Sequence, residues 1–203
     1  MPQLLTPNQE VKTTGKPVTL QHPELIDLLK KAYSAEKAAS YAYQGHAASV
    51  KDPKEKLAIR QIEEDEWNHR REVLAIMNQY GIKPSRWYEI RFALIGKTIS
   101  FSCHVIGWFM PFYFAGKLES GNVCEYFRMK QFFNSLGIKE HDKMLYEMGM
   151  KEKEHEIYFL SKIRNNKLLP FFEKLFNWGK SKSLNDVDWD RKYPVEDEGY
   201  CKR

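Results

Sequence analysis

Two glutamate and histidine pairs in this chain have a spacing that suits metal binding. Glu66 precedes His69 by three positions and Glu152 precedes His155 by three positions, so each pair reads Glu-x-x-His. Residues three apart lie on one face of a helix, where a carboxylate and an imidazole can bind the same cation. The two pairs therefore indicate a metal site, provided that both lie on helices whose faces meet.

Both pairs interrupt apolar stripes that have helical spacing. The flanking stripe residues are Ile62, Val73, Ile76 and Tyr80 for the first pair, and Leu145, Met148 and Phe159 for the second. A carboxylate that faces a core without a partner costs on the order of several kcal/mol. One alternative stays open, which is that Glu66 and Glu152 lie on solvated faces beside acidic neighbours such as Asp65 and Glu154.

Two further glutamates occupy equivalent positions on other long helical segments. Glu36 lies on the apolar stripe of the first segment, and Glu119 lies on that of the third. Two divalent cations would neutralise four carboxylates and use two imidazoles as neutral ligands, as in the di-iron carboxylate bundles. Iron suits this mixed ligand set, and manganese or zinc would also fit. The predicted metal ligands are Glu36, Glu66, His69, Glu119, Glu152 and His155.

Four long helical segments must position these residues. They run over residues 23–50, 53–80, 85–136 and 139–165, with Pro53, Gly81 and Gly137 as start and stop signals. No segment shows the alternation with a period of two that a strand requires. We therefore predict an all-α, ferritin-like antiparallel four-helix bundle with an aromatic-rich third helix that is kinked near Pro111.

Length and composition are those of one globular domain with tails. The chain has 203 residues, of which 42% are hydrophobic, and its net charge of +5 comes from interspersed signs. Wholly disordered and collagen-like classes are excluded, and nucleic-acid binding is not required. We expect a mobile arm over residues 1–22, the di-iron bundle over 23–166, and an aromatic and basic segment with a polar tail over 167–203.

The cysteines and the N-terminus favour a reducing compartment. Cys103, Cys124 and Cys201 form neither an even framework nor a CxxC pair, so we expect no disulfide scaffold. Residues 1–17 lack the apolar core of a secretion signal and contain no arginine, so they do not resemble a transit peptide. The expected location is cytoplasmic.

An uncharged, aromatic-rich run covers residues 98–116. Its length is borderline for a membrane span, but Glu119 must lie deep in the bundle directly after it, so we expect no span. The run is either bundle core or a cover for an apolar channel or bilayer face, formed by Trp108, Phe109, Phe112, Tyr113 and Phe114. The segment 168–178 is a second candidate for membrane contact, and the alternative is that it caps the bundle. We expect peripheral association with a membrane.

Over about residues 24–165 the sequence resembles the demethoxyubiquinone hydroxylase family, the di-iron monooxygenases of ubiquinone biosynthesis. A glutamate followed by tyrosine at +7 and glycine at +9 is matched by Glu36, Tyr43 and Gly45. The third-helix glutamate with a tyrosine seven residues on is matched by Glu119 and Tyr126, and both Glu-x-x-His pairs fit the family pattern. Two stretches, 83–84 and 92–94, resemble the family's link between the second and third helices.

The resemblance implies hydroxylation of a prenylated methoxy-benzoquinol by two iron ions, with dioxygen as co-substrate. Tyr43 and Tyr126 fall beside the predicted ligands, where a phenol can hydrogen-bond a carboxylate and orient it, so they are candidate catalytic residues. The chain departs from the family at residues 33–36, where the family has His-Ala-Gly-Glu. Glu125 replaces a histidine linked to proton or electron delivery, and we expect it to alter proton delivery.

Three other functions use a bundle of this kind. The first is another oxygenase, such as a tRNA side-chain hydroxylase or an aldehyde-deformylating enzyme, although lysine and arginine form no single basic run. The second is iron oxidation of the ferritin or rubrerythrin type, which does not need an aromatic run. The third is a lipid-binding partner protein with a vestigial site, which the complete ligand set disfavours. Expected partners are a prenylated quinol and a membrane surface, without nucleic acid, and a homo-oligomer stays open.

Overall fold

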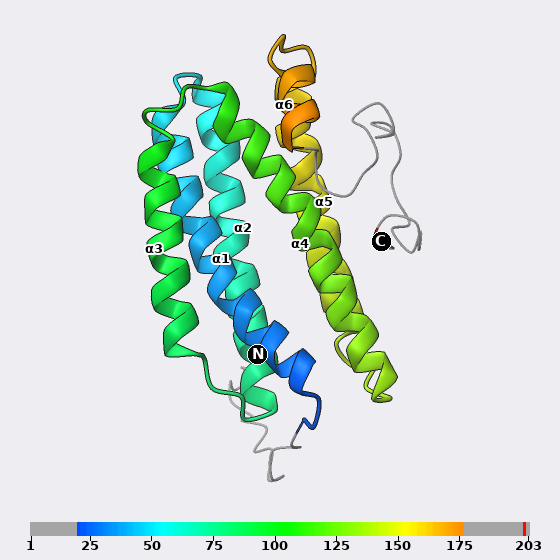
Figure 1. The fold of residues 1–203 in the computed structure, drawn as a ribbon. Coiled ribbons are helices and arrows are strands. Elements are labelled where there is room, and N and C mark those ends of the chain that lie inside the picture. The colour runs from blue at the N-terminus through cyan, green and yellow to red at the C-terminus, as the bar shows by residue number, and fades with distance from the viewer. Residues whose placement is uncertain (1–19, 177–200, 202–203) are drawn as a thin grey trace, which may run out of the picture.

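The computed structural model describes residues 20–176 and residue 201. That part of the chain forms six helices and contains no strand, so the all-α prediction is confirmed. The helices are α1 (Pro23–Ser49), α2 (Pro53–Gln79), α3 (Arg86–Ser102), α4 (Phe109–Ser135), α5 (Asp142–Ile163) and α6 (Leu169–Phe176), shown in Figure 1. Most of the predicted arm and of the predicted tail lies outside the described residues.

Local signals in the sequence set the ends of the helices. Pro53 occupies the first position of α2, where its missing N–H needs no partner, and Asp52 Oδ1 accepts a hydrogen bond from the Lys54 N–H at 2.7 Å. Gly81 and Gly137 follow α2 and α4 with φ angles of 66° and 75°, which glycine adopts without strain. The bounds predicted for the first, second and fourth helices agree with α1, α2 and α5 to within three residues.

The predicted single kinked helix over residues 85–136 is wrong, because the chain forms two helices there. A turn over residues 103–108 separates α3 from α4, and Gly107 in it has a φ of 79°, which no right-handed helix can contain. Pro111 lies in the first turn of α4, where its missing N–H needs no partner, instead of at a kink. Figure 1 shows α3 and α4 meeting at this turn. Helix α4 therefore carries Glu119.

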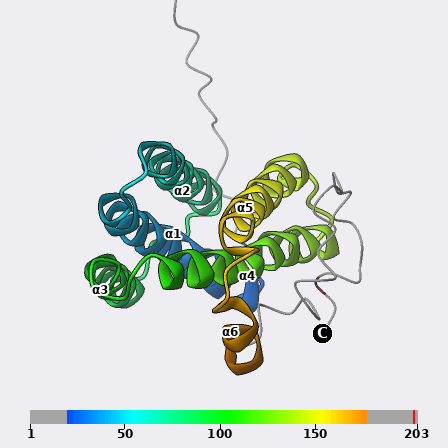
Figure 2. The ribbon, with the colours of Figure 1, turned by 90° about the horizontal axis from the view of Figure 1, so that it is seen from above.

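Helices α1, α2, α4 and α5 form the bundle, and α3 packs on the outside of α1 (Figures 1 and 2). Two hydrophobic clusters fill the bundle, and each of the four helices contributes to both. Representative members are Tyr43, Ile62, Phe112 and Phe159 in one cluster, and Leu29, Val73, Met129 and Leu145 in the other. Each of the four bundle helices therefore passes through the level between the two clusters. The predicted metal ligands lie in that level.

Polar contacts anchor the start of α3 to the bundle. The Glu89 carboxylate accepts hydrogen bonds from Arg70 of α2 at 2.8 and 3.0 Å and from the Ser34 hydroxyl of α1 at 2.8 Å. Burial opposes the charge on Glu89, but the hydrogen bonds from Arg70 and Ser34 outweigh it and lower its pKa. Glu89 is therefore a half-buried anion that connects three helices.

Two glycines bring the backbones of α1 and α3 into contact. A Cβ atom on Gly45 would lie 2.2 Å from the carbonyl oxygen of Ser100, and one on Gly96 would lie 2.5 Å from that of Ala38. Real atoms do not approach so closely, so neither position accepts a side chain unless the helices move apart. Gly45 is the glycine of the Glu36, Tyr43 and Gly45 motif. Its structural role is to let α3 pack closely against α1.

Cys124 of α4 and Cys201 form a disulfide, contrary to the expectation from the cysteine count. They are 77 residues apart, and no local pattern shows where the end of the chain returns. Cys103 is free and buried. Because disulfides are typical of oxidising compartments, the cysteines do not support the predicted reducing location.

We expect Gly45→Ala to lower the free energy of unfolding by about 1–3 kcal/mol, because the new methyl group collides with the backbone of α3. Gly121→Ala on α4 is the matched control, since no atom lies within 4 Å of the added Cβ there. That control should be neutral or stabilising by up to about 1 kcal/mol, as helix propensity improves. Chemical denaturation followed by circular dichroism measures both. Equal midpoints for the two variants would contradict the close packing of α1 and α3.

Candidate metal centre

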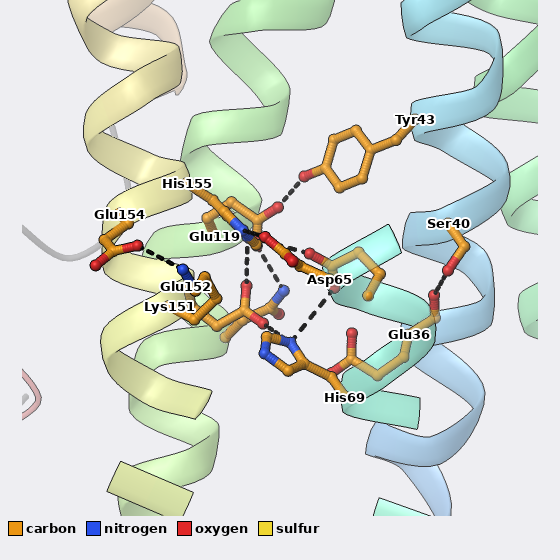
Figure 3. A network of polar contacts seen from close by, with 12 residues as sticks. Glu36, Ser40, Tyr43, Asp65, His69, Glu119, Lys151, Glu152, Glu154 and His155 are labelled. Atoms are coloured by element: carbon orange, nitrogen blue, oxygen red, sulfur yellow. Dashed lines mark hydrogen bonds and ion pairs between the residues drawn. The ribbon is translucent and has the colours of Figure 1, made fainter. Parts of the chain in front are cut away.

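The structure brings all six predicted ligands together in the level between the two hydrophobic clusters. Glu36 comes from α1, Glu119 from α4, and the two Glu-x-x-His pairs come from α2 and α5. All six residues are buried, with an exposed fraction of at most 4%. Glu66 and Glu152 are fully buried, so the alternative that they lie on solvated faces is wrong. Figure 3 shows five of the six converging from opposite sides of the bundle.

The ligand atoms form two overlapping groups. Glu36, Glu66, His69 and Glu152 make one group, and Glu66, Glu119, Glu152 and His155 make the other. Within each group, one ligand atom per residue lies within 4.8 Å of all the others. Glu66 and Glu152 belong to both groups, which is the position of carboxylates that bridge two cations. Each group also has one terminal carboxylate and one imidazole, so the two halves of the site match.

Seven buried ligand atoms in this level lack a regular hydrogen bond in the described part of the chain, and their near contacts are with one another: His69 Nδ1 lies 2.7 Å from Glu152 Oε1, and His155 Nδ1 lies 3.2 Å from Glu66 Oε1. They are Glu36 Oε2, both carboxylate oxygens of Glu66 and of Glu152, His69 Nδ1 and His155 Nδ1. Unpaired polar atoms are rare in protein interiors, because each has lost its hydration without compensation. Two bound cations, one in each ligand group, would supply partners to these atoms. The residues therefore fit a metal ion, with iron, manganese and zinc as suitable candidates for carboxylate and imidazole donors.

The ionisable side chains in this level strongly shift one another's pKa values. Burial raises the pKa values of Glu36 and Glu119 well above the usual range, and neighbouring carboxylates raise them further. Burial acts in the same direction on Glu152, but His69 and His155 outweigh it and hold the Glu152 pKa well below its usual range. Four carboxylates at this separation must share protons or cations, which is the electrostatic reason for expecting a metal here.

Asp65 orients one of the two imidazoles. Its Oδ2 lies 3.1 Å from His155 Nε2, so His155 donates from Nε2 and turns Nδ1 toward the carboxylates. Burial opposes the charge on Asp65, but this hydrogen bond outweighs it and lowers the Asp65 pKa. In the sequence Asp65 stood out only as an acidic neighbour of Glu66, and its contact with His155 was not predicted. The available signal was its position beside Glu66, which places it at the edge of the face that α2 turns toward α5.

Both candidate tyrosines contact a carboxylate of the site. Tyr43 donates a hydrogen bond to Glu119 Oε1, and Tyr126 donates one to Glu36 Oε1. Asn122 Nδ2 donates to the other oxygen of Glu119 at 2.9 Å. Burial and the charge of Glu36 raise the pKa of Tyr126 well above its usual value, so its phenol keeps the proton that it donates. The two tyrosines orient the terminal carboxylates of the two ligand groups.

Glu125 lies directly before Tyr126 on α4, but its side chain is exposed and belongs to neither ligand group. An altered proton delivery through Glu125 stays a prediction.

Comparisons with known proteins give no match. This holds for the family models, for the curated proteins and for the solved structures. Function must therefore be argued from the site, and the resemblance to demethoxyubiquinone hydroxylases stands as a hypothesis.

The overlap of the two ligand groups predicts different metal contents for two variants. The Glu36→Gln variant should bind about one ion per chain, because Glu36 belongs to one ligand group. The Glu66→Gln variant should bind both ions less tightly, because Glu66 belongs to both groups. Metal analysis after anaerobic incubation with ferrous iron measures this. Glu64→Gln is the control on the same helix, since the Glu64 side chain is 61% exposed. Two ions in all three variants would contradict the ligand assignment.

Proposed function

We propose that this protein is a di-iron monooxygenase that hydroxylates a prenylated methoxy-benzoquinol. The observation that carries the proposal is the pair of buried ligand groups that share Glu66 and Glu152, next to an apolar pocket. When bound, two iron ions would supply the activation of dioxygen. The resemblance described above suggests the substrate class, and the pocket supports it.

The pocket has a volume of about 650 Å³ and lies between α1, α3 and α4. Its walls are mostly apolar, with Ile99, Ile106, Met110, Phe114 and Leu118 among the lining residues. A volume in this range accommodates a substituted ring and part of an apolar tail. Tyr43 lines the pocket and also hydrogen-bonds Glu119, so a ligand in the pocket lies one side chain away from the metal ligands.

The aromatic residues at 108–114 do not together form an exposed surface suited to membrane contact. Phe109, Phe112 and Tyr113 are buried in the core of the bundle, which is one of the two interpretations left open by the sequence. Phe114 lines the apolar pocket, and Trp108 is 40% exposed. Within the described residues no helix is both long and apolar enough to cross a membrane, as expected for this run.

Exposed apolar residues gather instead on the outer face of α3. Trp87, Ile90, Leu94, Phe101 and the following Val105 are each between 66% and 71% exposed. A row of this length with basic residues beside it is typical of a helix that lies at a bilayer surface. We propose that α3 makes the peripheral membrane contact of this enzyme and that the substrate enters the pocket from that side.

Helix α6 combines the two interpretations offered for residues 168–178. Phe172 packs against Phe109 and Tyr113, so the helix caps the bundle at the start of α4. Phe171 and Leu175 point outward, with exposed fractions of 61% and 62%. We propose that these two residues extend the membrane contact of α3. Residues 177 and 178 lie outside the described part of the chain.

We expect the double variant Leu94→Glu, Phe101→Glu to reduce binding to liposomes of neutral and anionic phospholipid several-fold, because two charges would have to enter the interface. Co-flotation measures the bound fraction. Leu57→Glu is the control, because Leu57 is 72% exposed but belongs to α2 and not to α3. Wild-type protein that does not float, or equal loss in both variants, would argue against a membrane contact through α3.

Expression in a host that lacks its own demethoxyubiquinone hydroxylase should restore ubiquinone, and His155→Ala should abolish the rescue by removing an imidazole of the site. Glu154→Gln is the control next to it, since the Glu154 side chain is 66% exposed. If the purified protein binds iron and consumes oxygen without hydroxylating the quinol, the substrate class is wrong and another oxygenase on this scaffold is favoured. Failure to bind iron would contradict the di-iron proposal itself.

A further inference from the structure

His46 lines the apolar pocket, and its Nε2 atom has no hydrogen-bond partner among the described residues. It lies on α1, is 2% exposed, and its ring packs between Phe112 and Phe159, with centroid distances of 4.6 and 5.7 Å. Its Nε2 atom is fully buried and unpaired. Burial lowers the pKa of His46 to about 4, so the imidazole is neutral at pH 7 and offers one donor and one acceptor.

Three other polar side chains of the pocket already have partners. The Tyr43 hydroxyl donates to Glu119, the Ser102 hydroxyl donates to the carbonyl oxygen of Thr98 at 2.8 Å, and Lys117 donates to the carbonyl oxygen of Phe176. A buried imidazole without partners is unfavourable, because its hydration is lost and nothing replaces it. The pocket therefore keeps an unpaired imidazole nitrogen in a mostly apolar wall that also contains the free Cys103 thiol.

We propose that His46 binds the oxygen-bearing head group of an amphiphilic ligand, a quinol or quinone ring whose hydroxyl or carbonyl oxygens pair with the imidazole. This inference rests on the proposed function and names the residue that recognises its substrate. The oxygen of the ligand would displace no hydrogen bond at Nε2 of His46, since that atom forms none among the described residues. An apolar ligand without oxygens would leave the imidazole unpaired and would bind less tightly.

The positions of Tyr43 and His46 determine which end of a bound ligand would face the metal centre. They are three residues apart on α1 and share one face of that helix. Tyr43 contacts Glu119 of the metal ligands, so a ring held by His46 lies beside the metal centre. Two other lining residues, Ile99 and Leu118, are 41% and 48% exposed and mark the open side of the pocket. The apolar tail would leave on that side, next to the exposed face of α3.

The test is equilibrium binding to the metal-free protein with two probes, a methoxybenzoquinone that carries a short alkyl chain and the matching alkylbenzene without oxygens. His46→Leu should weaken the quinone about tenfold, the worth of one hydrogen bond, and leave the alkylbenzene unchanged. His46→Gln keeps a donor and an acceptor and should retain most of the quinone affinity. Ser102→Ala is the control, because the Ser102 hydroxyl is already paired.

Equal quinone affinity in wild type and His46→Leu would overturn the proposal, and so would an equal loss for both probes, which would indicate a change of pocket shape. If His46→Leu does not fold, the test is the carbonyl stretching frequency of the bound quinone. This frequency should differ between wild type and His46→Gln. Identical spectra would overturn the proposal. These assays need no turnover. Intact quinone binding without hydroxylation would therefore contradict the proposed function and leave the role of His46 standing.

Discussion

Burial of four carboxylates and two imidazoles in one level of a helical bundle is the constraint on which the other features of this structure depend. Charges placed so close together in an apolar interior are unfavourable unless cations or protons compensate them. The level is held in place by hydrophobic clusters above and below it, to which all four bundle helices contribute. Tyr43, Tyr126 and Asp65 then fix individual ligands by hydrogen bonds.

The two sides of this level differ in polarity. On the side of α2 and α5, a pocket of about 420 Å³ is lined by charged residues and reaches His69 and Asp65. On the side of α3 and α4, the larger apolar pocket reaches Tyr43 and His46. Water and ions can approach from the first side, and the proposed apolar substrate would enter from the second. This separation suits an oxidation in which an apolar substrate must be kept apart from polar reactants.

The break between α3 and α4 connects the fold to the proposed function. A single kinked helix would have kept residues 86–102 as a continuation of α4. The turn at Gly107 instead lets α3 lie against α1, where Gly45 and Gly96 permit backbone contact. One result is an outer helix with an exposed apolar face, and the other is a pocket between that helix and α4. The pocket therefore lies between the proposed membrane contact on α3 and the metal ligands in the bundle.

The sequence by itself determined the all-α class, the bounds of α1, α2 and α5, and the positions of Glu36, Glu119 and the two Glu-x-x-His pairs, because helix periodicity and caps are local properties. Only the tertiary structure decided which carboxylates belong to both ligand groups, that Asp65 orients His155, that Cys124 pairs with Cys201, and that His46 lies unpaired in an apolar pocket. These features depend on contacts between residues far apart in the chain. The turn at Gly107 was missed for the same reason, since only the packing of α3 against α1 distinguishes a broken helix from a kinked one.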